Sequence, residues 1–313
     1  MNLIFCGTPQ FAVPTLEKLL AENFSISLVV TNPDEPRGRG FELKAPPVKE
    51  FALRAGLKVF QPRRLKDSEA QTEISAIQPD AIVVVAYGHL IPPWMIDLPP
   101  LGCINLHASL LPRYRGAAPI AWAIIRGEHV TGVTTMKIDQ GLDTGDILLQ
   151  QQVEISEQDT TETLSGRLSA EGAPIMAETL ARLGRGEISP RRQDDQLATI
   201  APMLKKEDGL IDWRMTAQEI ANRVRGLRPW PVAHSLFRRK TLQVWAAQPL
   251  ESRLGPGFVP GDLQAAGGNL LIACGGGTAL QLIEVQLEGR KRISGRDFAN
   301  GVRLQPGERL GSE

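Results

Sequence analysis

Two segments of this chain hold residues whose types and spacing could do chemistry. Residues 104–119 read I-N-L-H-A-S-L-L-P-R-Y-R-G-A-A-P, and residues 138–147 read I-D-Q-G-L-D-T-G-D-I. The side-chain amide of Asn105 can donate to an oxygen that gains negative charge while a carbonyl is attacked. The imidazole of His107 can donate to that oxygen or carry a proton. Asp143 can stabilise an imidazolium and accept a proton, which completes a set that works without a metal.

The spacing of these residues suits a common site. The pattern Asn-x-His places Asn105 and His107 on one face of a strand, because side chains alternate along a strand. Asp143 lies between Gly141 and Gly145, where the backbone can turn sharply and present the carboxylate. We therefore predict that the three side chains meet around one carbonyl carbon.

Each of the three residues also has a purely structural interpretation. An asparagine at a strand end can cap a turn, a lone histidine can be satisfied within a core, and D-T-G can be a tight turn. A covalent mechanism has little support, because Ser109 lacks the G-x-S-x-G elbow of a serine nucleophile. The residues thus favour direct transfer.

The elements that must position this set alternate between apolar strands and helical patterns. Residues 81–86, A-I-V-V-V-A, are typical of a central strand buried on both faces, and residues 103–107 form the next strand. We predict an α/β fold with a doubly wound, mostly parallel sheet and helices on both faces. Ligands of such sheets bind at the carboxyl ends of the strands, where His107 lies. Further strands are predicted at 2–6, 26–31 and 57–60, and helices at 11–20, 47–55, 69–77 and 159–183.

A second, β-rich region follows a polar segment. We predict domain boundaries that give a catalytic domain at 1–189, a linker at 190–207 and a smaller C-terminal domain at 208–313. Gly- and Pro-rich turns separate short strands in this last part, which indicates a barrel-like domain. The elements expected there are a helix at 217–225 and strands at 233–237, 242–247, 270–273 and 280–286.

Composition excludes several classes of protein. The chain has 313 residues, 42% of them hydrophobic and 22% charged, as in globular domains. No apolar run is long enough to span a bilayer, and the N-terminus lacks the basic region of a signal peptide. Three scattered cysteines without a C-x-x-C motif argue against disulfides and zinc. We expect a cytoplasmic monomer with no metal and no membrane partner.

Nucleotide-binding fingerprints are also missing. Gly7-Thr8-Pro9 follows the first strand where dinucleotide folds carry G-x-G-x-x-G, and no P-loop occurs. A dehydrogenase is therefore not expected despite the alternating architecture. Residues 32–47 instead form a long irregular segment rich in proline and basic residues, in which Gly38 and Gly40 flank Arg39. The segment is either a variable surface loop or a flexible basic finger that approaches a partner.

Taken together, the motifs resemble the signature of the folate-dependent formyltransferases, from end to end of the chain. The two central segments carry most of this resemblance, as N-L-H-x-S-L-L-P-x-Y-R-G and D-x-G-x-D-T-G. Further matching segments are F-x-G-T-P-x-F at 5–11, R-G-R-G at 37–40, V-V-A-Y-G at 84–88, G-A-A-P-I at 116–120, I-D-W at 211–213 and P-W-P at 229–231.

The resemblance implies an activity and a set of residues. The formyl donor would be 10-formyltetrahydrofolate, a co-substrate, and the acceptor the α-amino group of methionine esterified to initiator tRNA. Asn105, His107 and Asp143 would form the catalytic set. The turn formed by Ser109, Leu110, Leu111 and Pro112 would bind the folate. A loop at 86–91, with Tyr87, Gly88 and Ile91, would line the pterin pocket.

The resemblance also implies contacts with tRNA. The basic finger, with Arg37 and Arg39, would probe the acceptor end, and the C-terminal domain would be similar to an oligonucleotide-binding barrel. Clusters of basic residues in the second half suggest a track for phosphates, although such clusters are also ordinary solvated faces. These are Lys205, Lys206, Arg223, Arg225, Arg228, Arg238, Arg239, Lys240 and residues 290–292. We expect Trp213, Trp230 and Trp245 to anchor the core rather than stack on bases.

Two alternatives stay open at this point. A related enzyme could formylate a small amine, such as a glycinamide ribonucleotide or an amino-sugar nucleotide. The extra C-terminal residues argue against the first of these, and the missing dinucleotide fingerprint argues against the second. A non-catalytic RNA-binding protein on the same fold is the other alternative, and the intact Asn105, His107 and Asp143 speak against it.

Overall fold

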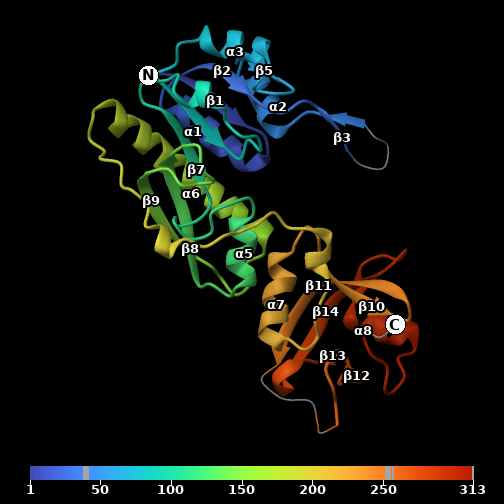
Figure 1. Ribbon diagram of the computed structural model, residues 1–313. Helices are drawn as coiled ribbons and strands as arrows, with labels where there is room; N and C mark the ends of the chain where they lie inside the picture. Colours follow the sequence, from blue (N-terminus) through green and yellow to red (C-terminus); the bar gives the residue numbers. More distant parts are fainter. Residues whose placement is uncertain (38–41, 251–254, 256, 312–313) are drawn as a thin grey trace. The chain divides into compact units, whose positions relative to one another are not determined.

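The computed structural model describes residues 1–37, 42–250, 255 and 257–311 (Figure 1). The chain divides into two compact units, each built from several stretches of sequence. Unit 1 comprises Met1–Pro119, Val130–Glu154 and Ser165–Ala201. Unit 2 comprises Ile120–His129, Ile155–Leu164 and Pro202–Glu313. Within the described ranges, no helix combines the length and apolar character needed to cross a bilayer.

Unit 1 is built on a seven-stranded sheet with the order β5-β2-β1-β6-β7-β8-β9. The strands β5, β2, β1, β6 and β7 run parallel, whereas β8 is antiparallel to β7 and β9 to β8. The strand order reverses between β1 and β6, as in doubly wound sheets, so the predicted fold class is confirmed. The strands are β1 Asn2–Gly7, β2 Ser25–Val30, β5 Val59–Phe60, β6 Ala81–Val85, β7 Cys103–His107, β8 Val130–Lys137 and β9 Ile147–Glu154.

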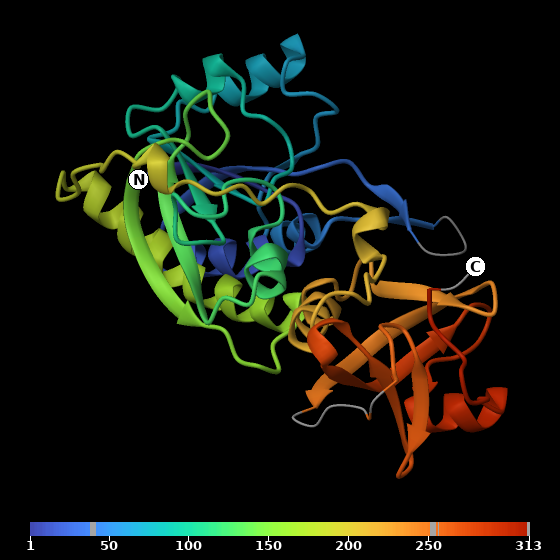
Figure 2. The ribbon, with the colours of Figure 1, turned by 60° about the horizontal axis from the view of Figure 1, so that its bottom comes forward.

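Helices cover both faces of this sheet (Figures 1 and 2). On one face, Ile74 and Met95 of two helices join a core with Ile82 of β6. On the other face, Gly172 leaves room for Leu106 of β7, because a Cβ there would lie 2.5 Å from a Leu106 methyl carbon. The helices are α1 Val13–Ala21, α2 Pro47–Arg54, α3 Ser68–Ser75, α4 Pro93–Ile96 and α6 Thr161–Gly184.

The segment expected to be irregular at 32–47 contains a short antiparallel ribbon. Strand β3, Glu35–Arg37, pairs with β4, Glu42–Lys44, in a register that places Glu35 opposite Lys44. Pro36 fits there because a two-stranded ribbon has a free edge on which a missing N–H costs no ladder bond. The expectation of no regular structure was thus wrong at both ends of the segment. Arg39 lies outside the described residues, as does the side chain of Arg37.

Unit 2 is β-rich and antiparallel, as predicted. Its sheet has the order β10-β11-β14-β13-β12, and β15 pairs with β14. Thr216 begins helix α7 with a capping box, accepting from the backbone of Glu219. The barrel-like closure stays a prediction. The elements are α5 Pro119–Ile125, α7 Ala217–Gly226, β10 Ala233–Phe237, β11 Lys240–Leu250, β12 Leu263–Ala266, β13 Asn269–Ala273, β14 Ala279–Leu287, β15 Ile293–Ser294 and α8 Gly295–Val302.

Candidate functional site

Strand β7 carries two of the three predicted side chains. Cys103, on the same side of the pleat as Asn105 and His107, packs into the core beneath α3 and α4. Ile104 and Leu106 point to the other face and are fully or almost fully buried. Alternation therefore places Asn105 and His107 on one face, about 6.6 Å apart along the strand at 3.3 Å per residue.

His107 is held by its distal ring nitrogen. The residue is buried, with 6% of its surface exposed, and Nε2 lies 2.9 Å from the carbonyl oxygen of Tyr114. A carbonyl only accepts, so Nε2 carries the hydrogen in this contact. The other nitrogen, Nδ1, lies 3.6 Å from Oδ2 of Asp143. Nδ1 is thus the nitrogen that can exchange a proton beside the carboxylate.

Asp143 occupies an unusual backbone position. Its φ is +53°, in the left-handed region that L-residues disfavour. The carboxylate accepts a hydrogen bond from the backbone N–H of Gly116 at 2.7 Å, so the turn after β7 orients the carboxylate. A Cβ on Gly145 would lie 1.8 Å from the carbonyl oxygen of Lys137, which means that only glycine lets the loop pack against β8.

Asn105 is half-buried and sits near the carboxyl end of β7, opposite Val84 in the register of β6. Among the described residues, no hydrogen bond joins its side-chain amide to protein. A fully buried side-chain amide would need acceptors within the protein. The amide of Asn105 is accessible and has no such acceptor among the described residues, so it can donate to a ligand. The structure therefore brings His107 and Asp143 together and leaves the Asn105 amide on the same face.

Sequence reasoning missed several residues around this set. The segment 190–201, expected as part of a linker, is bound to unit 1 by side chains and backbone. Gln193 donates to the carbonyl oxygens of Asp143 and Gly145, and Arg115 donates to Gln193. Thr199 accepts from the backbone N–H of Tyr114. These contacts engage backbone carbonyls and amides, which leave no pattern in a sequence.

The predicted folate turn, Ser109–Pro112, is fixed by buried hydrogen bonds. Thr134 of β8 donates to the carbonyl oxygen of Ser109 at 2.6 Å and accepts from the backbone N–H of Leu111 at 3.2 Å. Gln150 of β9 donates to the carbonyl oxygen of Leu111. Ser109 and Leu111 are buried, whereas Leu110 and Pro112 are half-buried. The latter two are the members of the turn that a ligand can touch.

The second predicted folate segment begins where β6 ends, at the point where the strand order reverses. Ala86 and Gly88 have positive φ values of 46° and 87°, so the backbone bends sharply there. Among the described residues, only the side-chain nitrogen of Asn32, at 3.8 Å, would meet a Cβ on Gly88, which leaves open space beside it. Tyr87 is buried in the core, and burial raises the pKa of its phenol. Ile91 packs partly buried on the same core.

These surroundings fit a folate-like group. Open backbone at Gly88 and the accessible Asn105 amide can bind polar ring edges, and Leu110 and Ile91 offer apolar surface. No group of three or more histidine, cysteine, aspartate or glutamate side chains that could hold a metal occurs in the described ranges.

The residues predicted to bind tRNA differ in whether an acidic side chain pairs with them. Lys205 and Lys206 are exposed, and so are Arg239 and Lys240 at the turn between β10 and β11. None of these four forms an ion pair within the described part of the chain. Arg238 does, because its guanidinium donates to both carboxylate oxygens of Glu308.

Other basic residues of the predicted phosphate track serve the protein itself. Arg225 donates to the carbonyl oxygens of Ser156 and Asp159, and burial lowers the pKa of its guanidinium. Arg228 donates to the carbonyl oxygen of Trp245. These partners could not be predicted from the sequence, because they are backbone atoms.

The tryptophans also divide. Trp213 is buried, as expected for a core anchor, and Arg292 lies over the partly buried ring of Trp245 at 3.6 Å. Trp230 is 56% exposed, so the expectation of a core anchor was wrong there. It follows helix α7 in the segment Pro229–Pro231, where proline cannot continue the helix and the chain turns away.

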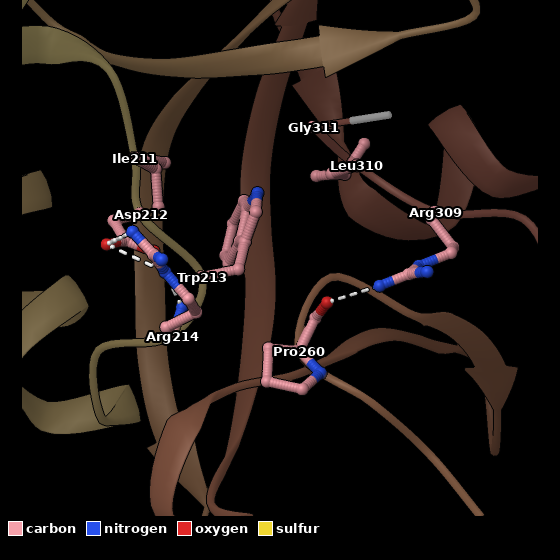
Figure 3. Close-up of a pocket in the computed structure, with 8 residues that line it drawn as sticks. All are labelled: Ile211, Asp212, Trp213, Arg214, Pro260, Arg309, Leu310 and Gly311. Carbon is pink, nitrogen blue, oxygen red and sulfur yellow. Dashed lines mark hydrogen bonds and ion pairs between the residues drawn. The ribbon is translucent and has the colours of Figure 1, made fainter. Parts of the chain in front are cut away.

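A separate cavity of about 390 Å³ lies within unit 2 (Figure 3). Arg214 pairs with Asp212 on one side of it, and Arg309 donates to the carbonyl oxygen of Pro260. These polar groups of the lining are therefore engaged within the protein. Among the lining residues there is no histidine beside a carboxylate, unlike His107 beside Asp143. Its lining consists of Ile211, Asp212, Trp213, Arg214, Pro260, Arg309, Leu310 and Gly311.

Comparison with known proteins matches these features to one family. The sequence model for "Formyl transferase" covers residues 1–180, and the model for "Formyl transferase, C-terminal domain" covers residues 203–303. The chain is 54% identical over 312 residues to the methionyl-tRNA formyltransferase of Koribacter versatilis, covering 99% of both chains. It is 52% identical to that of Acidobacterium capsulatum, covering 100% of both.

A solved structure shares the fold. The N-formyltransferase of Helicobacter canadensis, in complex with folinic acid and dTDP-3-aminofucose, superimposes with a TM-score of 0.68. The alignment covers 90% of this chain and 98% of that one at 19% identity. Two family models together match most of the chain, and full-length relatives are about half identical to it. The chain therefore belongs to the formyl transferase family.

Proposed function

We propose that this protein transfers the formyl group of 10-formyltetrahydrofolate to the α-amino group of methionyl-initiator tRNA. The observation that carries the proposal is the 54% identity to a methionyl-tRNA formyltransferase over 99% of both chains. The contact between His107 and Asp143 supports it, since the reaction needs a group that moves a proton beside a carbonyl. Formylation of the initiator methionine places the enzyme in translation initiation and in the cytoplasm.

When bound, 10-formyltetrahydrofolate supplies the activated formyl group. Leu110 and Pro112, the half-buried members of the turn after β7, contact its ring system, together with Gly88 and Ile91. Ser109 and Leu111 hold the turn from within, and Tyr87 supports the opposite loop through the core.

Asn105 stabilises the charge that develops on the formyl oxygen. Its amide has no protein acceptor within the described residues, so donation to the reacting oxygen sacrifices no existing hydrogen bond. One such donor typically contributes about 2.7–4 kcal/mol to the transition state.

His107 and Asp143 manage the proton of the attacking amine. Nε2 of His107 is committed to the carbonyl oxygen of Tyr114, so exchange runs through Nδ1. The carboxylate, 3.6 Å from Nδ1, stabilises the imidazolium form of His107 and receives the amine proton through water. The bond between the formyl carbon and the folate nitrogen then breaks, and this nitrogen leaves with the proton that Nδ1 of His107 gives up. The neutral amine is available near pH 7 because an α-amino group titrates at about 7.7–8.0 and esterification lowers that value.

The acceptor tRNA is bound mainly by charge. Arg37 and Arg39 of the finger approach the acceptor end, and Lys205, Lys206, Arg239 and Lys240 contact phosphates. Arg238, paired with Glu308, makes a weaker contribution. The enzyme acts as a monomer with a catalytic domain at 1–189, a linker at 190–207 and a tRNA-binding domain at 208–313.

One assay tests the proposal. The protein is incubated with 10-formyltetrahydrofolate and either methionyl-initiator tRNA, glycinamide ribonucleotide or an amino-sugar nucleotide, and the formylated products are measured. We expect formylmethionyl-tRNA alone. Formylation of a small amine in preference to the tRNA would refute the proposed acceptor, and no formylation at all would refute the activity.

A further inference from the structure

A buried glutamine lies directly behind the loop that carries Asp143. Gln193 is 5% exposed and belongs to the polar segment that follows α6. Its Nε2 donates to the carbonyl oxygens of Asp143 at 2.8 Å and Gly145 at 2.7 Å. A side-chain amide has two N–H donors, and both are used here. Gln193 thus bridges the two carbonyls on either side of Thr144.

Arg115 sets the orientation of this amide. Its Nε donates to Oε1 of Gln193 at 3.0 Å, and its Nη2 donates to Asp195 at 2.8 Å. A guanidinium only donates, so it holds the amide oxygen toward itself and turns the nitrogen to the loop. The backbone of Arg115 is fixed as well, donating to the carbonyl of Thr199 and accepting from Ala201.

The loop requires such support. The left-handed conformation of Asp143 is disfavoured for an L-residue, and it persists only where neighbouring contacts hold it. The two buried hydrogen bonds from Gln193 to the carbonyl oxygens of Asp143 and Gly145 are such contacts.

We propose that Gln193 is a positioning residue, which holds Asp143 in the conformation that aims its carboxylate at Nδ1 of His107. Gln193 touches only backbone atoms of the loop, so it acts through Asp143 rather than on the substrate. The inference rests on the proposed function, because it takes Asp143 to act in formyl transfer.

Two substitutions of Gln193 remove the clamp, meaning its hydrogen bonds to the carbonyl oxygens of Asp143 and Gly145, in different ways. Gln193→Ala deletes all three hydrogen bonds. Gln193→Glu keeps the size and the contact with Arg115 but sets a carboxylate oxygen against the carbonyls of Asp143 and Gly145. Asp194→Ala is the matched control: this neighbouring residue is exposed, and its carboxylate bonds only the backbone N–H of Gln196 within the described contacts.

The experiment is a double-mutant cycle with Asp143→Ala, read out as kcat and KM for both substrates. We expect either Gln193 substitution to lower kcat on the order of 10²-fold, as misplacement of a reacting group by about 1 Å can. Both KM values should stay within about threefold, since no substrate contact is lost. In the Asp143→Ala background, Gln193→Ala should change kcat by less than about twofold, because residues that act as one unit are not additive.

A crystal structure of Gln193→Ala gives a second readout that does not need activity. We expect the Asp143 carboxylate to leave its 2.7 Å contact with the backbone N–H of Gly116. If Gln193→Ala does not fold, Gln193→Glu carries the test, with folding checked by thermal unfolding and tRNA binding.

Three results would overturn the inference. They are a carboxylate that stays in place, an equal loss of kcat with and without the Asp143 side chain, and a loss no larger than that of Asp194→Ala. Failure of the proposed function looks different, because wild-type protein would then not formylate methionyl-tRNA although the crystallographic arm could still show the clamp.

Discussion

The backbone N–H of Gly116 donates to the carboxylate of Asp143 at 2.7 Å, across 27 positions of sequence. Gly116 belongs to the first central motif and Asp143 to the second, so this bond joins the two. Gly116 itself has a φ of +120°, and a Cβ there would lie 2.6 Å from the carbonyl oxygen of Ala201. The carboxylate of Asp143 is therefore oriented by a backbone conformation at position 116 that only glycine permits.

Asp143→Asn tests the charge of this acid without disturbing its backbone. Asparagine tolerates the left-handed region, and its amide oxygen can still accept from Gly116. We expect kcat to fall by about 10²–10⁴-fold, the usual contribution of a positioned acid or base. Asp143→Ala should lose as much activity and about 1–2 kcal/mol of stability as well. Steady-state kinetics and urea unfolding separate the two; undiminished turnover in Asp143→Asn would exclude a role for the charge.

Asn105→Ala removes a donor that no protein group needs. We expect kcat to fall by about 10²–10³-fold, since the lost interaction forms as charge develops on the reacting oxygen. The affinity for tRNA, measured by filter binding, should stay within about twofold. Asn105→Ala would be shown to act on binding instead if KM rose while kcat held.

Gly145→Ala should damage the loop that carries Asp143. The added Cβ would overlap the carbonyl oxygen of Lys137, so the loop must move away from β8. Gly166→Ala in helix α6 is the control, because nothing lies within 4 Å of its Cβ position and alanine favours a helix by about 0.5–1 kcal/mol. We expect loss of activity in the first variant and a slightly higher thermal midpoint in the second. Equal activity in both variants would contradict the steric argument.

The sequence was most informative where side chains alone define the pattern. The Asn-x-His alternation predicted the face of β7, and the D-T-G motif predicted a sharp turn at Asp143, which its positive φ confirms. Strands β8 and β9 were not predicted. Thr134 and Thr135 of β8 are fully buried, with hydroxyls bonded to Ser109 and Thr179. Because threonine is a polar residue type, the sequence of β8 did not show the apolar pattern expected of a buried strand.

The supporting residues were beyond sequence reasoning for a related reason. Gln193 stands in P-R-R-Q-D-D-Q, a stretch whose composition indicates a solvated linker. Its burial depends on two backbone carbonyls 48 and 50 positions away, which carry no side-chain signal. Patterns of polarity therefore identified the proposed reacting groups, but only the folded chain reveals what holds them.

The ion pair between Arg238 and Glu308 should make unit 2 sensitive to acid. Hydrogen bonds from Arg238, helped by the backbone N–H of Gln305, hold the pKa of the Glu308 carboxyl below its ordinary value. A lowered pKa contributes stability above the unfolded value of about 4.3, and this contribution is lost as the pH falls through the folded pKa. Because the side chain of Arg238 is half-exposed, screening by solvent keeps this contribution small.

Glu308→Gln should therefore lower the urea midpoint at pH 7, and the difference from wild type should shrink as the pH falls through the folded pKa of Glu308. Glu17→Gln is the control, because this exposed residue of α1 forms no ion pair in the described part of the chain. A difference between wild type and Glu308→Gln that did not shrink as the pH was lowered would show that the carboxylate charge is not its cause.

The exposed basic residues should govern the salt dependence of tRNA binding. Each phosphate contact adds roughly 0.7–0.9 to the slope of log Kd against log salt concentration, because its formation releases a counterion. We expect Arg239→Ala to lower this slope by about one contact, since no acid neutralises Arg239 within the described residues. Arg185→Ala should leave it unchanged, because Arg185 is held by both carboxylate oxygens of Glu187.

Arg39→Ala extends the same test to the finger, whose tip lies outside the described residues. We expect a larger rise in KM for tRNA than for folate, because the residue would contact only the acceptor end. Titrations of the variants and wild type at several salt concentrations supply the slopes, and steady-state kinetics supplies the KM values. Equal losses for both substrates would assign Arg39 to the catalytic site rather than to tRNA.

The salt dependence of tRNA binding decides the role of Arg239 separately. If the slope of log Kd against log salt concentration were identical for Arg239→Ala and Arg185→Ala, the turn between β10 and β11 would not belong to the phosphate track.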